Sequence, residues 1–232
     1  MSSKKGLVFG AHGAIGSAVA LAFEKNGYEV WRSSRSHKPH IGRGLVAIGE
    51  SDADARAMQS IPELDVVIWA QGSNLNDSVK DFSEHDFDGV MNANVTFIAS
   101  TLSTLINQNK IVNGAKLCFV SSIWQDAIRP NKFSYAVSKA ALNGLVKSVA
   151  LDLSDKKILV NAVLPGVIDT PMTRGVLNDE QIRAVQGRTG FGRLVKPEEL
   201  AEVIFFLGSD SNNCITGQSI VADLGFSNVR PI

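Results

Sequence analysis

The sequence contains little cysteine, and neither sign of charge is in excess. Its two cysteines, Cys118 and Cys214, are far apart in the chain, so we expect no disulfide framework and a reduced, cytoplasmic setting. The 23 basic residues equal the 23 acidic ones, and no local basic stripe is present that would hold a polyanion. We therefore expect neither a nucleic acid nor a membrane surface as a partner.

Long apolar runs and linkers are missing too. Lys4 and Lys5 precede an apolar stretch over residues 7–23, as in a signal peptide, but His12 and several glycines interrupt it. No stretch approaches the roughly 18 apolar residues of a membrane-spanning helix. No linker rich in proline, glycine or serine and no internal repeat divides the 232 residues. We therefore expect a single domain over residues 1–232.

Short apolar runs alternate with helical patterns along the chain. The runs have the composition of buried strands and lie at residues 6–9, 29–31, 45–48, 65–69, 116–120, 159–163 and 219–221. The helical patterns lie at residues 14–26, 52–60, 83–108, 133–153 and 197–207. Strands that are apolar on both faces and separated by helices predict a parallel sheet that is covered on both sides. The expected fold is α/β: a doubly wound, Rossmann-type parallel sheet of about seven strands with helices on both faces.

The least regular stretch covers residues 170–196 and contains a short helical pattern near 179–186. It is too long for a routine connection, so we expect it to cover a substrate site. The apolar residues that either line a pocket there or pack on the core are Trp124, Phe133, Met172, Val176, Leu177, Ile182 and Val185. The basic residues that either suit an anionic substrate or form a solvated face are Arg174, Arg183, Arg188 and Arg193.

The first expected strand runs into a glycine-rich turn and then into a helix. In order, the turn consists of Gly10, Ala11, His12, Gly13, Ala14, Ile15 and Gly16. Glycines in such a turn let the backbone approach a pyrophosphate, whose charge the amides at the helix N-terminus stabilise. The pattern predicts a dinucleotide site, and a tight turn without a ligand is the alternative. His12 suits a place beside a phosphate and a solvated loop position equally well.

The second expected strand ends at residues 32–35, where the adenine ribose of a dinucleotide would lie. No acidic residue stands there, whereas NAD sites use a carboxylate that accepts hydrogen bonds from the ribose 2′-hydroxyl. Ser34 and Arg35 are able to donate hydrogen bonds to a 2′-phosphate instead. This favours NADP over NAD, and NAD stays open because arginines after a strand are mostly solvated surface charge.

Tyr135 and Lys139 are four residues apart at the start of a helical pattern, so their side chains share one face. Reduction of a ketone by hydride leaves an oxygen that must gain a proton, and a phenol with a pKa of about 10 is a poor proton donor near neutrality. A neighbouring ammonium favours the tyrosinate and lowers this pKa. Ser122, which follows a strand, is able to hydrogen-bond the carbonyl oxygen. A surface pair and a turn serine are the simpler alternatives.

Together these residues make the chain resemble the short-chain dehydrogenase/reductase family almost end to end. Residues 10–16 are similar to the family's Thr-Gly-x-x-x-Gly/Ala-x-Gly turn, with Phe9 in place of the threonine. Residues 69–72 read Trp-Ala-Gln-Gly where Asn-Asn-Ala-Gly is common, and residues 215–218 resemble the family's C-terminal signature. The side chains that match its catalytic tetrad in order are Asn94, Ser122, Tyr135 and Lys139.

The resemblance implies an NADP(H)-dependent oxidoreductase that interconverts a ketone or aldehyde and an alcohol. Tyr135 would be the acid/base, while Lys139 would lower its pKa and bind the nicotinamide ribose. Ser122 would orient the carbonyl, and Asn94 would hold a water behind Lys139. Residues 161–170 resemble the segment that holds the nicotinamide carboxamide. The expected cofactor-binding residues are Gly10, His12, Gly13, Ala14, Ile15, Gly16, Ser34, Arg35, Ala70, Gly72, Tyr135, Lys139, Pro165, Gly166, Ile168 and Thr170.

A non-catalytic NADP-binding sensor or scaffold with the same fold is the alternative function. The resemblance further implies a homodimer or homotetramer that pairs through the helices over residues 83–108 and 133–153. No metal site is expected, because His37 and His40 share a polar loop without partner ligands. Gly49 and Glu50 stand where the family often has an aspartate against adenine, and no adenine contact is assigned to them.

Overall fold

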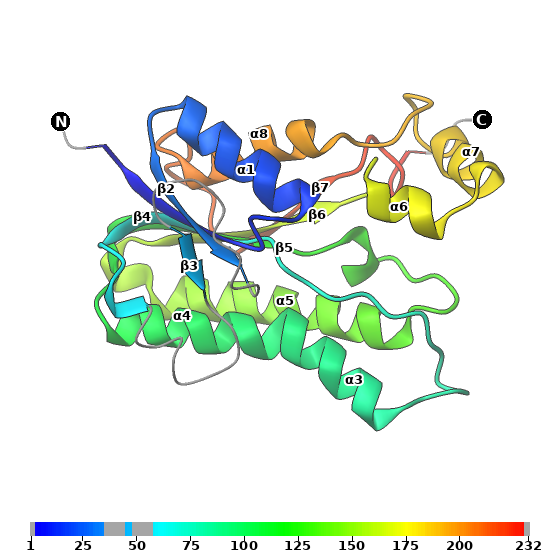
Figure 1. The fold of residues 1–232 in the computed structure, drawn as a ribbon, viewed down its shortest axis with the longest axis horizontal. Helices are drawn as coiled ribbons and strands as arrows, with labels where there is room; N and C mark the ends of the chain where they lie inside the picture. Colours follow the sequence, from blue (N-terminus) through cyan, green and yellow to red (C-terminus); the bar gives the residue numbers. More distant parts are fainter. Residues whose placement is uncertain (1–2, 35–44, 48–57, 230–232) are drawn as a thin grey trace.

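The computed structural model describes residues 3–34, 45–47 and 58–229, and within them a parallel sheet lies between helices (Figure 1). The strands are β1 (Lys5–Phe9), β2 (Glu29–Ser34), β3 (Leu45–Ala47), β4 (Leu64–Trp69), β5 (Ile111–Val120), β6 (Leu159–Pro165) and β7 (Gln218–Ala222). The α-helices are α1 (Ala14–Lys25), α3 (Glu84–Met91), α4 (Phe97–Asn107), α5 (Phe133–Asp152), α6 (Pro171–Val176), α7 (Asp179–Gly187) and α8 (Pro197–Gly208). The π-helix η1 (Asn92–Thr96) and the 3-10 turns η2 (Ile123–Gln125) and η3 (Ser154–Lys156) complete the set. The predicted fold class is confirmed.

The central strands are buried on both faces, as their apolar sequences predict. In β1, Leu7 and Phe9 belong to one core cluster and Val8 belongs to the other, because successive side chains of a strand point to opposite faces. The first cluster also takes side chains from α4 and α5, and the second takes them from α1 and α8. Figure 1 shows these two helix layers on opposite sides of the sheet.

The strand order is β3-β2-β1-β4-β5-β6-β7, with parallel pairing throughout. Six of these strands have five or more residues, while β3 has three and lies at the edge. The chain leaves β1 toward β2 on one side and returns to β4 on the other. The connections that leave β1 and β4 therefore run in opposite directions along the carboxyl edge of the sheet. Open α/β sheets bind ligands at such a point.

One long helical stretch, Glu84–Asn107, differs from its sequence expectation. Within the described residues it has the length and apolar composition of a membrane-spanning helix, which the sequence had not indicated. Composition is weak evidence here, because a helix that covers a sheet passes the same test. In this fold Ile98, Leu102 and Leu105 are buried in the core, and the π-helix η1 interrupts the stretch around the fully buried Asn94.

The segment over residues 170–196 is more regular than expected, because α6 precedes the short helix α7. Thr170 caps α6 by accepting a hydrogen bond from the Thr173 amide at 3.1 Å, and Pro171 occupies the first turn. This Thr-Pro start is a helix signal that the sequence analysis did not use. Two expected elements lie partly outside the described residues. These are the strand 45–48, at Ile48, and the helix 52–60, over residues 52–57.

Gly16→Ala is expected to lower the free energy of unfolding by about 1–3 kcal/mol, as overpacking of a close contact does. A Cβ at this position would lie 2.2 Å from the Gly10 carbonyl oxygen and 3.0 Å from the Ala11 Cα, so backbone would have to move. Gly13→Ala in the same turn is the control, since its Cβ would meet the Gly10 oxygen at an ordinary 3.4 Å. Chemical denaturation measures both, and equal losses would contradict the packing role given to Gly16.

Candidate active site

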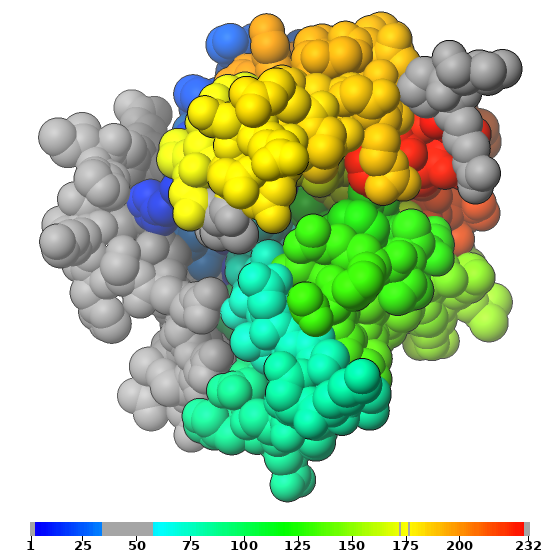
Figure 2. Space-filling view, turned by 90° about the vertical axis from the view of Figure 1, so that its right-hand side faces the viewer, coloured from blue at the N-terminus to red at the C-terminus, as the bar shows by residue number. Residues whose placement is uncertain are grey.

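A cavity of about 1220 Å³ opens at the carboxyl edge of the sheet. Figure 2 looks onto this end of the molecule and shows the hollow between the yellow surface of α6 and α7 and the green surface around η2. Gly16, Asn94 and Pro165 are not among its lining residues. The predicted site residues that do line it are Gly10, His12, Gly13, Ala14, Ile15, Ala70, Gly72, Ser122, Tyr135, Lys139, Gly166, Ile168 and Thr170.

The glycine-rich turn forms one wall of the cavity. Gly10 has φ +73°, which favours glycine, and a Cβ there would lie 2.6 Å from the Gln71 amide nitrogen. The turn after β1 therefore touches the turn after β4. Gly13 is the N-cap of α1, so the free amides of the first helical turn face the part of the cavity that Ala14 and Ile15 line. This is the arrangement that binds an anion.

The side chain of Asn94 fixes the turn after β4 by hydrogen bonds to its backbone. Its Oδ1 accepts a hydrogen bond from the Ser73 amide at 2.8 Å, and its Nδ2 donates to the Ser73 carbonyl at 2.9 Å and to the Ser138 hydroxyl at 2.9 Å. A Cβ on Gly72 would lie 3.0 Å from Asn94 Oδ1 and 3.5 Å from Lys139 Nζ. The Asn94 amide thus lies next to Gly72 and positions the Ser73 backbone, but Asn94 itself is not among the cavity-lining residues.

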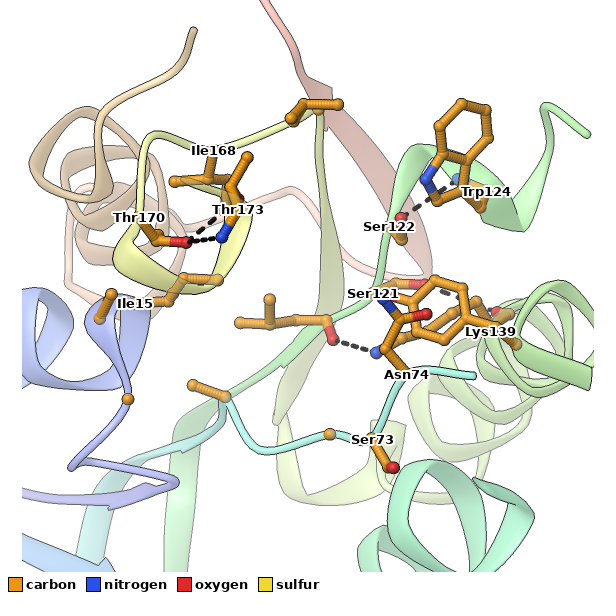
Figure 3. A pocket seen from close by; sticks show the side chains of 18 of the residues that line it. Ile15, Ser73, Asn74, Ser121, Ser122, Trp124, Lys139, Ile168, Thr170 and Thr173 are labelled. Atoms are coloured by element: carbon orange, nitrogen blue, oxygen red, sulfur yellow. Dashed lines mark hydrogen bonds between the residues drawn. The ribbon is translucent and has the colours of Figure 1, made fainter. Parts of the chain in front are cut away.

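Ser122, Tyr135 and Lys139 come together at the end of β5. Ser122 precedes η2, and its hydroxyl accepts a hydrogen bond from the Trp124 amide at 3.2 Å and lies close enough to the Tyr135 phenol to lower its pKa. Lys139 Nζ donates to the Val120 carbonyl at 3.1 Å and lies 5.6 Å from the centre of the Tyr135 ring. Figure 3 shows Ser122 and Lys139 on one side of the cavity, opposite Ile15 and Thr170.

Burial governs the titration of this group. It lowers the pKa of the Lys139 ammonium to about 8, because removal from water disfavours the charged form. It raises the pKa of the Tyr135 phenol for the same reason, and the nearby Ser122 hydroxyl opposes the rise. The family resemblance implied a lowered tyrosine pKa. In the protein alone the desolvation of the phenol outweighs the effect of the Ser122 hydroxyl, so the pKa is raised.

The segment after β6 forms the opposite wall. Gly166 packs so closely on Asp223 that a Cβ would lie 2.8 Å from the Asp223 Cβ. Ile168 forms an isolated bridge with Val195, which ties both ends of the covering segment together. Of the apolar candidates for a pocket wall, Trp124, Leu177 and Val185 line the cavity, whereas Ile182 and Phe133 do not.

Lys132 and Gln71 are polar lining residues that the sequence patterns did not single out. Lys132 is 3% exposed, and its ammonium lies 5.4 Å from the centre of the Tyr135 ring. Its position three residues before Tyr135, at the N-cap of the same helix, was the available sign. Gln71 lines the cavity too, and among the described residues its buried amide oxygen and nitrogen have no hydrogen-bond partner.

Arg35, His37, His40, Gly49 and Glu50 lie outside the described residues. The side chains of Ser34, Met172 and Val176 are not described either. Ser34 is the last residue of β2 and pairs with Ala47, and Ser33, which pairs with Phe9, lines the cavity.

The cavity fits a nicotinamide dinucleotide. The open amides of the first turn of α1 suit a pyrophosphate, and the missing Cβ of Gly72 leaves room in front of Lys139. The unpartnered amide of Gln71 is a buried donor and acceptor that hydroxyl groups of a ribose would satisfy. No acidic side chain is among the lining residues, so nothing in the described wall repels phosphate.

Known proteins resemble this chain over nearly its whole length. A family profile described as Enoyl-(Acyl carrier protein) reductase matches residues 49–227. Glucose 1-dehydrogenase of Gluconobacter oxydans is 30% identical over 247 residues, which cover 97% of this chain and 92% of the relative. A short chain dehydrogenase family protein of Francisella tularensis has a TM-score of 0.89 at 25% identity, covering 98% and 100% of the two chains. ElxO with NADP bound has a TM-score of 0.83 at 26% identity, covering 98% and 100%.

The free energy of unfolding is expected to rise between about pH 8 and pH 10.5, and Lys139→Met should reduce this rise. Folded Lys139 loses its proton near pH 8, whereas in the unfolded chain it keeps the proton to about pH 10.5. Unfolding therefore takes up a proton in this window, and rising pH opposes it. The contribution of Lys139 is on the order of 3 kcal/mol.

Denaturant titrations at both ends of that window measure the effect. Burial likewise lowers the pKa of Lys132 to about 8. Lys132 therefore contributes to the rise in the free energy of unfolding in both the wild type and the Lys139 variant. Lys147→Met, at an exposed position of the same helix, is the control and should keep the wild-type pH dependence. A variant at Lys139 with an unchanged rise would show that this ammonium is not buried as described.

Proposed function

The chain belongs to the short-chain dehydrogenase/reductase family, and we propose that it is an NADP(H)-dependent oxidoreductase that interconverts a ketone or aldehyde and an alcohol. One observation carries the proposal. A half-buried phenol, a serine hydroxyl near it and a buried ammonium beside it meet in a cavity at the carboxyl edge of the sheet. This is a proton-transfer group in a place where the fold binds ligands.

When bound, the nicotinamide would supply or accept the hydride. Tyr135 would donate a proton to the carbonyl oxygen in reduction and take it from the hydroxyl in oxidation. The Ser122 hydroxyl, which lies near the Tyr135 phenol, would hold the same oxygen and stabilise its developing charge. Lys139 would stabilise the tyrosinate that remains, because its ammonium lies beside the ring.

Asn94 would act through the backbone. Its three hydrogen bonds hold Ser73 and Ser138, and the Ser138 hydroxyl donates in turn to the Tyr135 carbonyl at 2.8 Å. Asn94 would therefore keep the turn after β4 and the start of α5 in register. A water held behind Lys139 stays part of the proposal.

The cofactor would lie across the carboxyl edge of the sheet. Residues 10–16 would bind its pyrophosphate, residues 70–72 its ribose, and residues 165–170 its carboxamide. NADP is favoured over NAD by Ser34, the last residue of β2, and by Arg35, which follows it in the sequence, and by the NADP found in ElxO, a protein with the same fold. A cytoplasmic location and a homodimer or homotetramer stay predictions.

Tyr135→Phe is expected to lower kcat by about 10²- to 10⁴-fold while the affinity for NADPH stays close to wild type, because only the proton donor is removed. A panel of ketones, aldehydes and alcohols, followed by the absorbance of NADPH, measures turnover. Tyr28→Phe is the matched control, since Tyr28 is the other of the two tyrosines in the chain and is not among the lining residues of the cavity. Near wild-type turnover in Tyr135→Phe would falsify the assignment. Tight NADPH binding by a protein that turns over nothing in the panel would favour the sensor or scaffold.

NADP is expected to bind at least about 10-fold more tightly than NAD, and Arg35→Ala should remove most of this difference, because a charge-assisted hydrogen bond to the 2′-phosphate is lost. Isothermal titration of both dinucleotides measures it. Arg32→Ala on β2 is the control, since its guanidinium is engaged by Glu24 at 2.9 Å. Equal affinities for the two cofactors, unaffected by Arg35→Ala, would overturn the preference.

A further inference from the structure

The described walls of the cavity carry positive charge. Arg129, Lys132, Lys139 and Arg188 are among its lining residues, as is His12, and no aspartate or glutamate occurs among the lining residues that the structure describes. His12 lies in the glycine-rich turn, and Lys139 lies beside Tyr135. The other three form a second basic group, which the proposed reaction does not use. Its positive potential favours an anion in the cavity.

Each of the two arginines of this group contacts an aromatic ring, and the two rings contact each other. The Arg129 guanidinium lies 5.4 Å from the centre of the Trp124 ring, and the Arg188 guanidinium lies 4.4 Å from the centre of the Phe226 ring. The Trp124 and Phe226 rings meet edge to face at 6.3 Å. Three distant parts of the chain are involved: the segment around η2, the end of α7 and the turn after β7. Each guanidinium thus lies within cation–π distance of an aromatic ring, and such a contact leaves its N–H groups able to donate hydrogen bonds to a ligand.

Neither arginine is neutralised within the described part of the chain. Arg129 and Arg188 form no ion pair with any carboxylate there, and both are exposed. Arg174 and Arg193 in the covering segment behave differently, because Asp169 and Glu199 pair with them at 2.7 Å. Of the four arginines in that segment, Arg188 is the one among the lining residues.

Lys132 adds positive charge deeper in the cavity. Its ammonium donates hydrogen bonds to the Asn74 side chain and to the Leu75 carbonyl at 3.2 Å, both of which are uncharged. Burial and the nearby charge of Arg129 both lower its pKa, and Asp77 opposes them only in part. Two cations thus lie close together on one wall. A bound anion would relieve their repulsion.

We propose that the substrate of this cavity is a carbonyl compound, or its alcohol, that carries a carboxylate or phosphate group, and that Arg129 and Arg188 bind this group at the mouth. The proposal rests on the proposed function, because it names the substrate class of the same site. The two guanidiniums present planar pairs of N–H donors, which match the oxygens of either anion. The Trp124 and Phe226 rings between them would contact the carbon chain of the substrate.

The first experiment compares anionic carbonyl compounds with matched neutral ones. The probes are a homologous series of straight-chain oxo-carboxylates and their methyl esters, together with dihydroxyacetone phosphate and dihydroxyacetone. We expect kcat/KM for the best anion to exceed that of its neutral partner by at least about 10-fold. The carboxylate and phosphate arms decide which anion is preferred. Equal or higher kcat/KM for the neutral partners would overturn the proposal.

Substitution of the arginines locates the effect. Arg129→Gln and Arg188→Gln should each raise KM for the anionic substrate by about 10- to 100-fold, change kcat little, and leave KM for the neutral partner unchanged. Arg174→Gln and Arg193→Gln are the controls, since their guanidiniums are already paired with carboxylates. An equal rise in KM for anion and ester, or the same rise in the controls, would count against the assignment.

Binding measurements separate this proposal from the proposed function. Isothermal titration of the oxo-carboxylates into the Tyr135→Phe protein with NADP present reports binding without turnover. Binding that is lost in Arg129→Gln and Arg188→Gln would support the anion site even if no substrate were reduced, and lack of binding would overturn it. The affinity for NADP should be unchanged in both arginine variants. A loss of NADP affinity would instead assign these arginines to the cofactor.

Discussion

The burial of the Lys139 ammonium is the interaction on which the site depends. An ammonium group removed from water must be compensated, and the Val120 carbonyl at 3.1 Å does this at the end of β5. That contact joins the last residue of a central strand to the first turns of α5, so the Tyr135 phenol on the same helix face is brought beside Ser122. The missing Cβ of Gly72 keeps the approach to the ammonium open. The low pKa of Lys139, about 8, is the electrostatic consequence of this burial.

The charged side chains described in the cavity wall around this centre are all basic. The described lining of the cavity includes basic side chains at both ends and no carboxylate. At one end the helix N-terminus of α1 suits the phosphates of a dinucleotide. At the other, Arg129 and Arg188 flank the aromatic pair Trp124 and Phe226. A cavity that binds a polyanionic cofactor gains nothing from acidic side chains in its wall, and the same electrostatics extends to the substrate end.

Much of the fold followed from local patterns. Alternation of apolar strands with helices predicted the parallel sheet, because strands buried on both faces need apolar side chains at every position. The ends of elements were less well predicted: β5 begins at Ile111 rather than at residue 116, and the capped helix α6 was not expected. The spacing of Tyr135 and Lys139 placed them on one helix face correctly. The burial of Lys132, which precedes the same helix, was not predicted. It depends on contacts with Asn74 and Leu75, which are distant in sequence.

Local sequence patterns were enough to predict the class of fold, the glycine-rich turn and the order of the polar residues that meet at the sheet edge. These features depend on the period of a strand or helix and on backbone conformations that only certain residues adopt, and both are local properties. The tertiary structure alone decided which arginines of the covering segment are paired with acids and which one lines the cavity. It also decided that burial raises the pKa of Tyr135 in the protein alone. Charge pairing and desolvation depend on groups that folding brings together from distant parts of the chain, and a linear pattern carries no record of those distances.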